Sequence, residues 1–445
     1  MNTSKSMTRI ASTTARTSIR AAVAIALATS SCSAAAATNE ELEARIAQLE
    51  AVIAELVAGE KEQESEPQLV QLERPETKWP TLSDDDGSST RYSFGGYIKV
   101  DAMFSDLSAG DLAPSSAGTQ FYIPGTIPVG DAEGEGPDAA VQARETRLSF
   151  KSEHTLASGK QASTYIELDF FLSGFGNERV SNSYAPRMRH AYLTYDKWLI
   201  GQTWTTFQDV GALPENLDFV GPAESTVFNR QGMIRYTHGA LELAIENPET
   251  TLTPNGGGAR IVSDDGPLPD FAARYTFKLA NGYIKAAGLL RSLDYDIGGQ
   301  DDSTVGYGLS VSGKHNFGRD DFRWMATTGS GMGRYIGLNT SNGGVLDSAG
   351  NIEAIDQFGI FGSYRHFWND NWRSNLTLSY LSNDNPVDLT GDGVTKEAYS
   401  VHLNLLYSPY PRMTVGGELI YAQRETESGA DGDLTRLLVS AKYAF

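Results

Sequence analysis

Basic side chains stand at alternate positions of several short segments between residues 91 and 330. In an extended strand, alternate residues share one face, so these cations lie opposite the neighbouring Tyr, Phe, Ile and Val side chains. Cations gathered along a water-filled passage attract anions, because low-dielectric walls focus the electric field. The candidate anion-guiding residues are Lys99, Arg147, Lys151, Arg187, Arg189, Arg235, Arg274 and Arg323.

Internal ion pairing is the alternative role for these cations. The carboxylates available for it on neighbouring segments are Glu145, Glu153, Glu167 and Asp169. The segments that hold Arg189, Arg235 and Arg274 have no carboxylate within their own strand cores, which favours anion guidance over pairing. Most other acidic residues fall in connecting stretches such as GDAEGEGPDAA and DYDIGGQDD, so a basic lining is expected beneath acidic loops.

Residues that could perform catalysis or bind metal are not arranged for either task. The 6 histidines occur singly, without the H-x-x-x-H spacing of a metal-binding helix. Ser330 lies in TTGSGMG, which is not a G-x-S-x-G motif, and DLTGDG lacks the remaining ligands of a calcium loop. We therefore predict no enzymatic activity, no catalytic residue, no metal site and no cofactor. The net charge of -20 also argues against nucleic acid as a partner.

The elements that would position the cations are alternating segments that recur up to the end of the chain. The last ten residues, RLLVSAKYAF, place Leu437, Val439 and Tyr443 on one face and Arg436 and Lys442 on the other. Sixteen such strands are predicted, near 91–104, 142–156, 161–172, 187–195, 198–205, 231–238, 240–247, 271–278, 281–290, 305–317, 321–331, 354–367, 370–381, 397–408, 412–424 and 434–445.

The connections between these strands alternate in length. Seven are short (LASGK, YDKW, HG, KLANG, FGRD, FWNDN and SPYPR), and the eight between them are expected to run from about ten residues to nearly forty. This pattern predicts an all-β fold, a sixteen-stranded antiparallel transmembrane β-barrel with both termini on the short-turn side, which is the periplasmic side of an outer membrane. Hydrophobic residues make up only 40% of the chain, and no run of 18 apolar residues follows the leader, so a helical membrane protein is excluded.

Closure of the barrel explains why an alternating apolar strand ends the sequence. A closed barrel satisfies every backbone group in lipid, and the apolar face of its last strand meets hydrocarbon. Tyr443 and Phe445 are the predicted closure residues. The third long connection, residues 206–230, contains two prolines, and we expect it to fold inward as a constriction; an external flap is the alternative.

The N-terminal region predicts export and self-association. Residues 1–37 have the basic and apolar parts of a signal peptide, with lipidation at Cys32 as the alternative route of processing. Within residues 38–61 a heptad seam predicts a short periplasmic coiled coil, formed by Leu42, Ile46, Leu49, Ile53 and Leu56.

The packing of this seam leaves its stoichiometry open. Isoleucine at a and leucine at d would favour two strands, and a helix lying on its own barrel is the alternative to self-association. Residues 62–90 are proline-rich and acidic and are interpreted as a linker, so the barrel is assigned to residues 91–445.

Three segments carry a resemblance to a known family: RYSFGGYIKVDAMF, PRMRHAYLTYDKWLIGQTWTTFQDV and FNRQGMIRYTHG. With the heptad-bearing extension, they resemble the DcaP-like porins of Gram-negative outer membranes. The resemblance implies a homotrimer of sixteen-stranded barrels in outer-membrane lipid, a periplasmic coiled coil, and a preference for small anionic solutes such as dicarboxylates. The terminal aromatic residue resembles the signal that such barrels present to the barrel assembly machinery.

We therefore expect an outer-membrane porin for the diffusion of small hydrophilic, preferentially anionic solutes. A general, weakly selective porin is the alternative within the same class. An outer-membrane lipase and an envelope tether are the alternatives from other classes.

Overall fold

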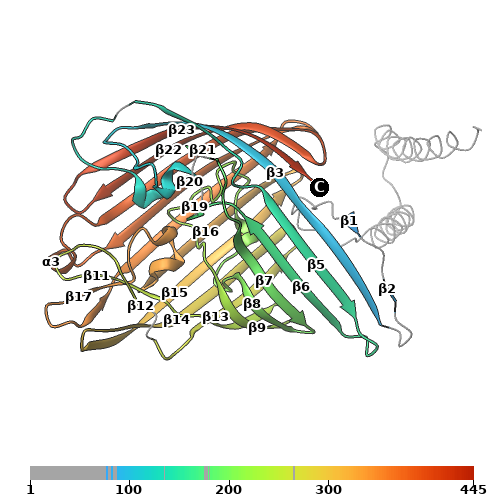
Figure 1. Ribbon diagram of the computed structural model, residues 1–445, viewed down its shortest axis with the longest axis horizontal. Helices are drawn as coiled ribbons and strands as arrows, with labels where there is room; N and C mark the ends of the chain where they lie inside the picture. The colour runs from blue at the N-terminus through green and yellow to red at the C-terminus, as the bar shows by residue number, and fades with distance from the viewer. Residues whose placement is uncertain are drawn as a thin grey trace, which may run out of the picture. The chain divides into compact units, whose positions relative to one another are not determined.

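The computed structural model describes residues 77–78, 82–83, 88–134, 136–174, 179, 181–263 and 266–445 (Figure 1). The predicted signal peptide, Cys32 and the coiled coil at 38–61 lie outside the described residues, as does most of the predicted linker. The described residues belong almost entirely to the barrel and its connections.

Nineteen strands of the described chain form one sheet, and three of them are short: β1 (Thr77–Lys78), β2 (Leu82–Ser83) and β4 (Asp138–Gln142). The other sixteen make a closed antiparallel barrel, which confirms the predicted fold class. They are β3 (Ser89–Leu107), β5 (Arg147–Thr155), β6 (Gln161–Asp169), β7 (Arg187–Tyr195), β8 (Trp198–Trp204), β9 (Arg230–His238), β10 (Leu241–Glu246), β13 (Asp270–Leu279), β14 (Gly282–Ile297), β15 (Gln300–Phe317), β16 (Asp320–Ser330), β19 (Asp356–Phe367), β20 (Trp372–Asp384), β21 (Thr395–Tyr410), β22 (Met413–Thr426) and β23 (Asp431–Ala444).

The last strand closes the barrel on the first (Figure 1). Strand β23 pairs with β3 in antiparallel register, with Val439 opposite Ala102 and Tyr443 opposite Ile98. The backbone N–H of Phe445 donates to the carbonyl of Gly96 at 3.1 Å. No edge of the main sheet is therefore left between these two strands, and both predicted closure residues lie at the seam.

The two faces of the barrel differ as the alternation predicts. On β23 the side chains of Leu437, Val439 and Tyr443 are exposed to the outside by 44%, 47% and 45%, whereas Arg436 and Ser440 are buried on the inside. The exposed apolar face suits hydrocarbon, and the buried polar face requires partners within the barrel.

The seven short turns are confirmed, but two of the outer connections are shorter than expected. Strands β14 and β15 continue past the predicted loop and are joined by Gly298 and Gly299 alone, and β22 and β23 are joined by residues 427–430. Both glycines have positive φ, 68° and 85°, which is the conformation of a two-residue hairpin turn. The GG pair is thus a hairpin signal. The acidic residues around it gave this stretch the composition of a long loop.

The longer outer connections contribute small elements of their own. Two of them form a second, four-stranded sheet from β11 (Thr250–Thr253), β12 (Ile261–Ser263), β17 (Gly344–Leu346) and β18 (Ile352–Ala354). The described helical segments are the 3₁₀ turns η1 (Ala117–Thr119), η2 (Pro124–Thr126), η3 (Val210–Ala212), η4 (Gly333–Tyr335) and η5 (Gly337–Asn339) and the single turn α3 (Val387–Thr390). Among the described residues, no helix is long and apolar enough to cross a membrane.

A charge on the outer face tests the assignment of that face. Val439→Arg should destabilise the barrel by roughly 2–4 kcal/mol, because an arginine near the bilayer midplane loses its hydration. Unfolding of the reconstituted protein in urea, followed by the difference in gel mobility between boiled and unboiled samples, measures this loss.

Thr435→Arg provides the depth control. Thr435 is also exposed but lies nearer the outer end of β23, where the same charge should cost at most about 1 kcal/mol. Equal stability of the Val439→Arg variant and the parent would contradict the lipid-facing assignment.

Candidate functional site

The connection between β8 and β9, residues 205–229, lies inside the barrel and is called loop L3. Its atoms bond to inward-facing residues on strands from β3 round to β22. These wall residues are Lys99, Arg274, Lys285, Ser312, Arg323, Arg365, Arg373, Ser379, Ser400 and Glu418. An external flap could not reach positions so widely spread on the inner wall, so the predicted inward fold of the loop is confirmed.

Asp209 holds the first part of L3. Its carboxylate accepts hydrogen bonds from Lys285 Nζ at 2.8 Å and from Ser312 Oγ at 2.9 Å. The same side chain accepts the N–H of Gly211 at 3.1 Å and so caps η3. One carboxylate therefore shapes the loop and ties it to β14 and β15.

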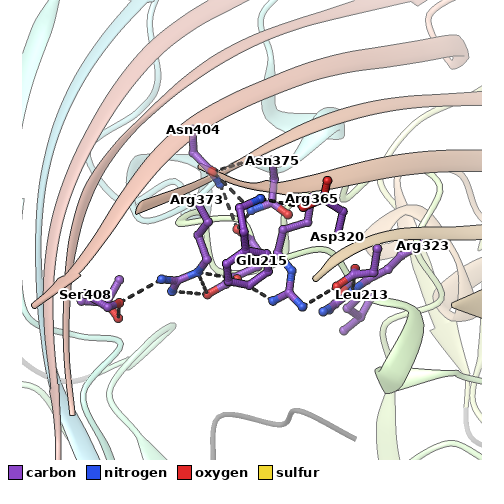
Figure 2. A network of polar contacts seen from close by, with 12 residues as sticks. Leu213, Glu215, Asp320, Arg323, Arg365, Arg373, Asn375, Asn404 and Ser408 are labelled. Carbon is purple, nitrogen blue, oxygen red and sulfur yellow. Dashed lines mark hydrogen bonds and ion pairs between the residues drawn. The ribbon is translucent and has the colours of Figure 1, made fainter. Parts of the chain in front are cut away.

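Glu215 holds the middle of L3, at the centre of the network in Figure 2. Its carboxylate accepts from Arg373 Nε at 2.9 Å and from Arg365 Nη1 at 2.8 Å, and its backbone carbonyl accepts from the side-chain amides of Asn375 and Asn404 at 3.0 and 2.9 Å. Burial alone would raise the pKa of Glu215, but the hydrogen bonds and charges of the two guanidinium groups lower it to about 2. Glu215 is therefore ionised at any pH well above 2.

The segment of L3 that follows Glu215 is held by β22 and β3. Glu418 on β22 accepts the backbone N–H of Leu217 at 2.6 Å, and Lys99 on β3 donates to the carbonyl of Leu217 at 2.6 Å. His402 lies 3.2 Å from the Glu418 carboxylate, and both side chains are fully buried. The loop thus crosses the interior from β14 to β3 with anchors along its whole length.

Several of the eight predicted cations hold L3 in place. Lys99, Arg274 and Arg323 donate to backbone carbonyls of the loop, those of Leu217, Gln208 and Leu213. Arg235 donates to the Thr206 hydroxyl at 2.8 Å. Lys151 instead pairs with a residue of its own strand, Glu153, at 2.9 Å.

Cross-strand carboxylates pair with the arginines that the sequence suggested were unpaired. Arg187 and Arg189 on β7 contact Asp169 on β6 at 2.7 and 2.9 Å, and Arg189 also contacts Glu167 at 2.8 Å. The absence of a carboxylate from the arginines' own strands, which favoured anion guidance over pairing, therefore does not exclude pairing. That argument considered only residues within one strand. Same-face neighbours on adjacent strands are closer to each other than residues two apart along a strand.

Arg235 and Arg274 illustrate the same error. Both contact Glu242 on β10, the strand between them, with Arg274 Nε at 2.7 Å and Arg235 Nη1 at 3.8 Å from its carboxylate. Pairing and loop anchoring therefore account for these two cations together.

The opposite wall carries four arginines that receive no counter-charge from L3. We call them the basic girdle: Arg147, Arg187, Arg189 and Arg230. The guanidinium groups of the first three lie 5.8, 5.8 and 5.2 Å from the ring of Phe219 on L3. Four arginines against the two carboxylates of Glu167 and Asp169 leave a surplus of two positive charges. This wall therefore carries a net positive charge toward the loop.

Arg230, at the start of β9, was missed by the sequence analysis. Its guanidinium lies over the rings of Trp204 at 4.6 Å and Phe228 at 5.7 Å, and it forms no ion pair with a described residue. Its Nη1 atom has no hydrogen-bond partner among the described residues. The residue lies in the segment FNRQGMIRYTHG just before the alternation begins, so a search for cations at alternate strand positions passed over it.

Arg365 and Arg373 were missed for a different reason. They do occupy alternate positions, in SYRHFW and NWRSN, but only the fold shows that their partner Glu215 lies some 150 residues earlier in the chain. Among the described residues, no group of three or more His, Cys, Asp or Glu side chains could hold a metal ion.

A closed antiparallel barrel with an apolar outer face, a charged interior and a loop folded across that interior is the architecture of an outer-membrane porin. Residues 24–445 match the model of the DcaP outer membrane protein family, and the chain belongs to this family. The resemblance seen in the sequence is thereby confirmed, and so is the outer-membrane location.

Solved structures agree with the fold. The outer membrane channel DcaP of Acinetobacter baumannii is similar with a TM-score of 0.68 and 20% identity, over 82% of this chain and 100% of that chain. The loop L8 deletion mutant of OmpT from Vibrio cholerae (TM-score 0.48, 12% identity, 80% and 99%) and the anion-selective porin from Comamonas acidovorans (TM-score 0.49, 11% identity, 80% and 100%) are more distant. No curated protein matches the chain.

The Glu215 anchor can be tested by a nearly isosteric change. Glu215→Gln keeps the shape of the side chain but leaves Arg365 and Arg373 without this counter-charge, which should weaken docking of L3 by on the order of 3 kcal/mol. Faster hydrogen exchange in residues 205–229 and larger fluctuations of single-channel current are the expected results.

Glu425→Gln is the control. It removes the exposed ion pair between Glu425, on the outer part of β22, and Lys396, and it should change neither the hydrogen exchange of L3 nor the current fluctuations. Parent-like exchange of L3 in the Glu215→Gln variant would show that the carboxylate is not the anchor.

Proposed function

We propose that this outer-membrane porin passes small hydrophilic solutes by diffusion, with a preference for anions and with small dicarboxylates as the expected solute class. The proposal rests on one observation: charge is distributed unequally around L3. Asp209 and Glu215 of the loop neutralise wall cations on β14, β19 and β20, whereas the basic girdle on the other side keeps its surplus. A solute that approaches this side of L3 therefore meets net positive charge.

The physical effect of this arrangement is a local enrichment of anions. A surplus charge lining a narrow aqueous passage acts through field lines that the protein walls confine. Guanidinium groups bind carboxylates through paired N–H donors, and the side chains of Arg147 and Arg187 remain partly exposed, by 16% and 24%. A solute with two carboxylates could meet two members of the girdle, which supports dicarboxylates as the expected class.

A weakly selective porin is the second candidate, and one observation favours it. Arg189 is buried and contacts both Glu167 and Asp169, so its charge is largely balanced at the wall. The two candidates differ in whether Arg230, together with the paired Arg147 and Arg187, acts on passing ions.

The oligomer and the N-terminal region complete the proposal. We propose a homotrimer that the barrel assembly machinery inserts into the outer membrane. Residues 38–61 would form a periplasmic coiled coil through Leu42, Ile46, Leu49, Ile53 and Leu56, joined to the barrel by the linker 62–90 after removal of the signal peptide 1–37. The family resemblance supports three strands over the two that heptad packing alone favours.

Charge reversal at Arg230 tests the selectivity. Arg189 is unsuitable for this test, because a glutamate there would lie beside Glu167 and Asp169. Arg230→Glu changes the surplus of the girdle from two positive charges to none and should lower the anion-to-cation permeability ratio about two- to fourfold, because the positive field that enriches anions is lost while salt screens the remaining effect. The reversal potential under a salt gradient in planar bilayers measures the ratio.

Arg319→Glu is the matched control, since it makes the same change of charge at an exposed periplasmic turn beside Asp370. An equal shift in both variants would indicate an effect of total charge. An unchanged reversal potential in Arg230→Glu would contradict the role of the girdle.

The heptad should contribute to the oligomer without defining the pore. Changing Ile46 and Ile53 together to Asp places charges in the seam and should weaken the trimer band of unboiled samples on gels, while the conductance of each barrel stays the same. Ala47→Asp with Ala54→Asp adds the same charges one position off the seam and should leave the band intact. An undiminished trimer band in the seam variant would argue against the coiled coil.

A further inference from the structure

An apolar groove runs along the outside of the barrel across β8, β9, β10, β13, β14 and β15. It has a volume of about 790 Å³ and is lined only by aliphatic, aromatic, alanine and glycine residues. Its rims include Trp198, Tyr236, Leu243, Phe271, Leu290 and Leu309, whose side chains point away from the barrel interior. The groove is thus a depression in the face that meets hydrocarbon.

Two small residues in neighbouring strands create the depression. In the register of the sheet, Leu243 lies opposite Ala273, Ala273 opposite Gly288, and Gly288 opposite Leu309. A Cβ atom at Gly288 would meet no heavy atom within 4 Å. Large side chains therefore flank a floor of two small ones.

The next outward row forms a wall beside this floor. It consists of Ile245, Phe271, Leu290 and Tyr307, which are paired in register and are all exposed. The floor is consequently bounded along the strands as well as across them.

An empty groove in a bilayer is unfavourable, because its lining loses dispersion contacts. A flexible acyl chain can follow such a depression. Since lipid tails are as apolar as leucine, the groove gains no hydrophobic energy from a tail, and a preference for one lipid must come from close packing and from contacts to the headgroup. The two ends of the groove therefore decide which lipid it suits.

The periplasmic end carries the features of a headgroup site. Trp198 and Tyr236 lie next to the short turns there, with ring centroids 4.8 Å apart, at the level where aromatic side chains meet lipid headgroups. Lys197, in the turn before Trp198, is exposed, and its carbonyl accepts the N–H of Thr237 at 2.9 Å, which ties the turn to β9. A lysine at this rim suits a phosphate.

The outer end is less suitable for a phosphate. Ribbon β14–β15 carries the exposed carboxylates Asp296 and Asp301 beyond the groove.

At the periplasmic end, Asp196 lies 3.9 Å from Lys160, so it does not stand as an unpaired charge beside Lys197. Charge complementarity therefore selects a lipid whose headgroup is at the periplasmic surface.

We propose that this groove is a binding site for a glycerophospholipid of the periplasmic leaflet, with one acyl chain over Ala273 and Gly288 and the phosphate beside Lys197. The site is separate from the pore interior and does not depend on solute selectivity. It accounts for a row of small residues on a barrel face where large apolar side chains otherwise predominate.

Native mass spectrometry of the full chain in mild detergent, titrated with phosphatidylglycerol, tests the site. The parent should retain bound phosphatidylglycerol. Gly288→Leu fills the groove and should lower the bound fraction about fivefold or more, and Lys197→Glu, which repels the phosphate, should lower it about fivefold. Gly417→Leu is the control: Gly417 also faces outward, on β22, where an added Cβ has only the carbonyl of Leu438 at 3.9 Å, and this variant should bind like the parent.

Heat-modifiable gel mobility confirms that each variant has folded before it is compared. Parent-like binding by Gly288→Leu would overturn the proposal. Dissociation of the oligomer by Gly288→Leu, with lipid binding retained, would show that a second copy of the chain covers the groove. Equal binding by Lys197→Glu and the parent, together with stronger binding of lipopolysaccharide than of phosphatidylglycerol, would assign the groove to the outer leaflet and overturn it as well.

Discussion

The requirement that every backbone polar group find a partner in hydrocarbon determines the rest of this structure. Strands can meet it only in a closed barrel, which is why β23 returns to β3 and why the N–H of Phe445 bonds to Gly96. Closure also separates the two faces of each strand permanently. The apolar face meets lipid, and the charged face is enclosed with the water and the loop inside.

Enclosed charges must then be balanced, and L3 balances them on one side. Asp209 and Glu215 pair with Lys285, Arg365 and Arg373 on the wall formed by β14, β19 and β20. The same contacts that fold the loop inward therefore remove positive charge from that wall. The surplus of the basic girdle around Phe219 remains, so the anchoring of the loop and the proposed selectivity of the pore arise from one distribution of charge.

The sequence predicted the barrel well, because the two-residue period and the alternation of short and long connections are local signals. It placed the strand faces correctly and identified the inward loop from its two prolines. It failed at DYDIGGQDD, where acidic residues concealed a two-residue hairpin turn. Partners were harder to predict, since Arg187 and Asp169 meet only because two strands pair, and Glu215 meets Arg373 only because the loop crosses the barrel. Those pairings depend on register and on long-range folding, which no spacing along one segment records.

The most direct test of this charge distribution is the salt dependence of selectivity in the unmodified protein, measured from reversal potentials in planar bilayers under gradients of potassium chloride. A surplus of fixed positive charge predicts a preference for chloride at about 0.01 M salt, where the Debye length is near 30 Å, that declines toward equal permeability at about 1 M, where it is near 3 Å. A permeability ratio near one, or a preference for potassium, at the lowest salt would contradict the account.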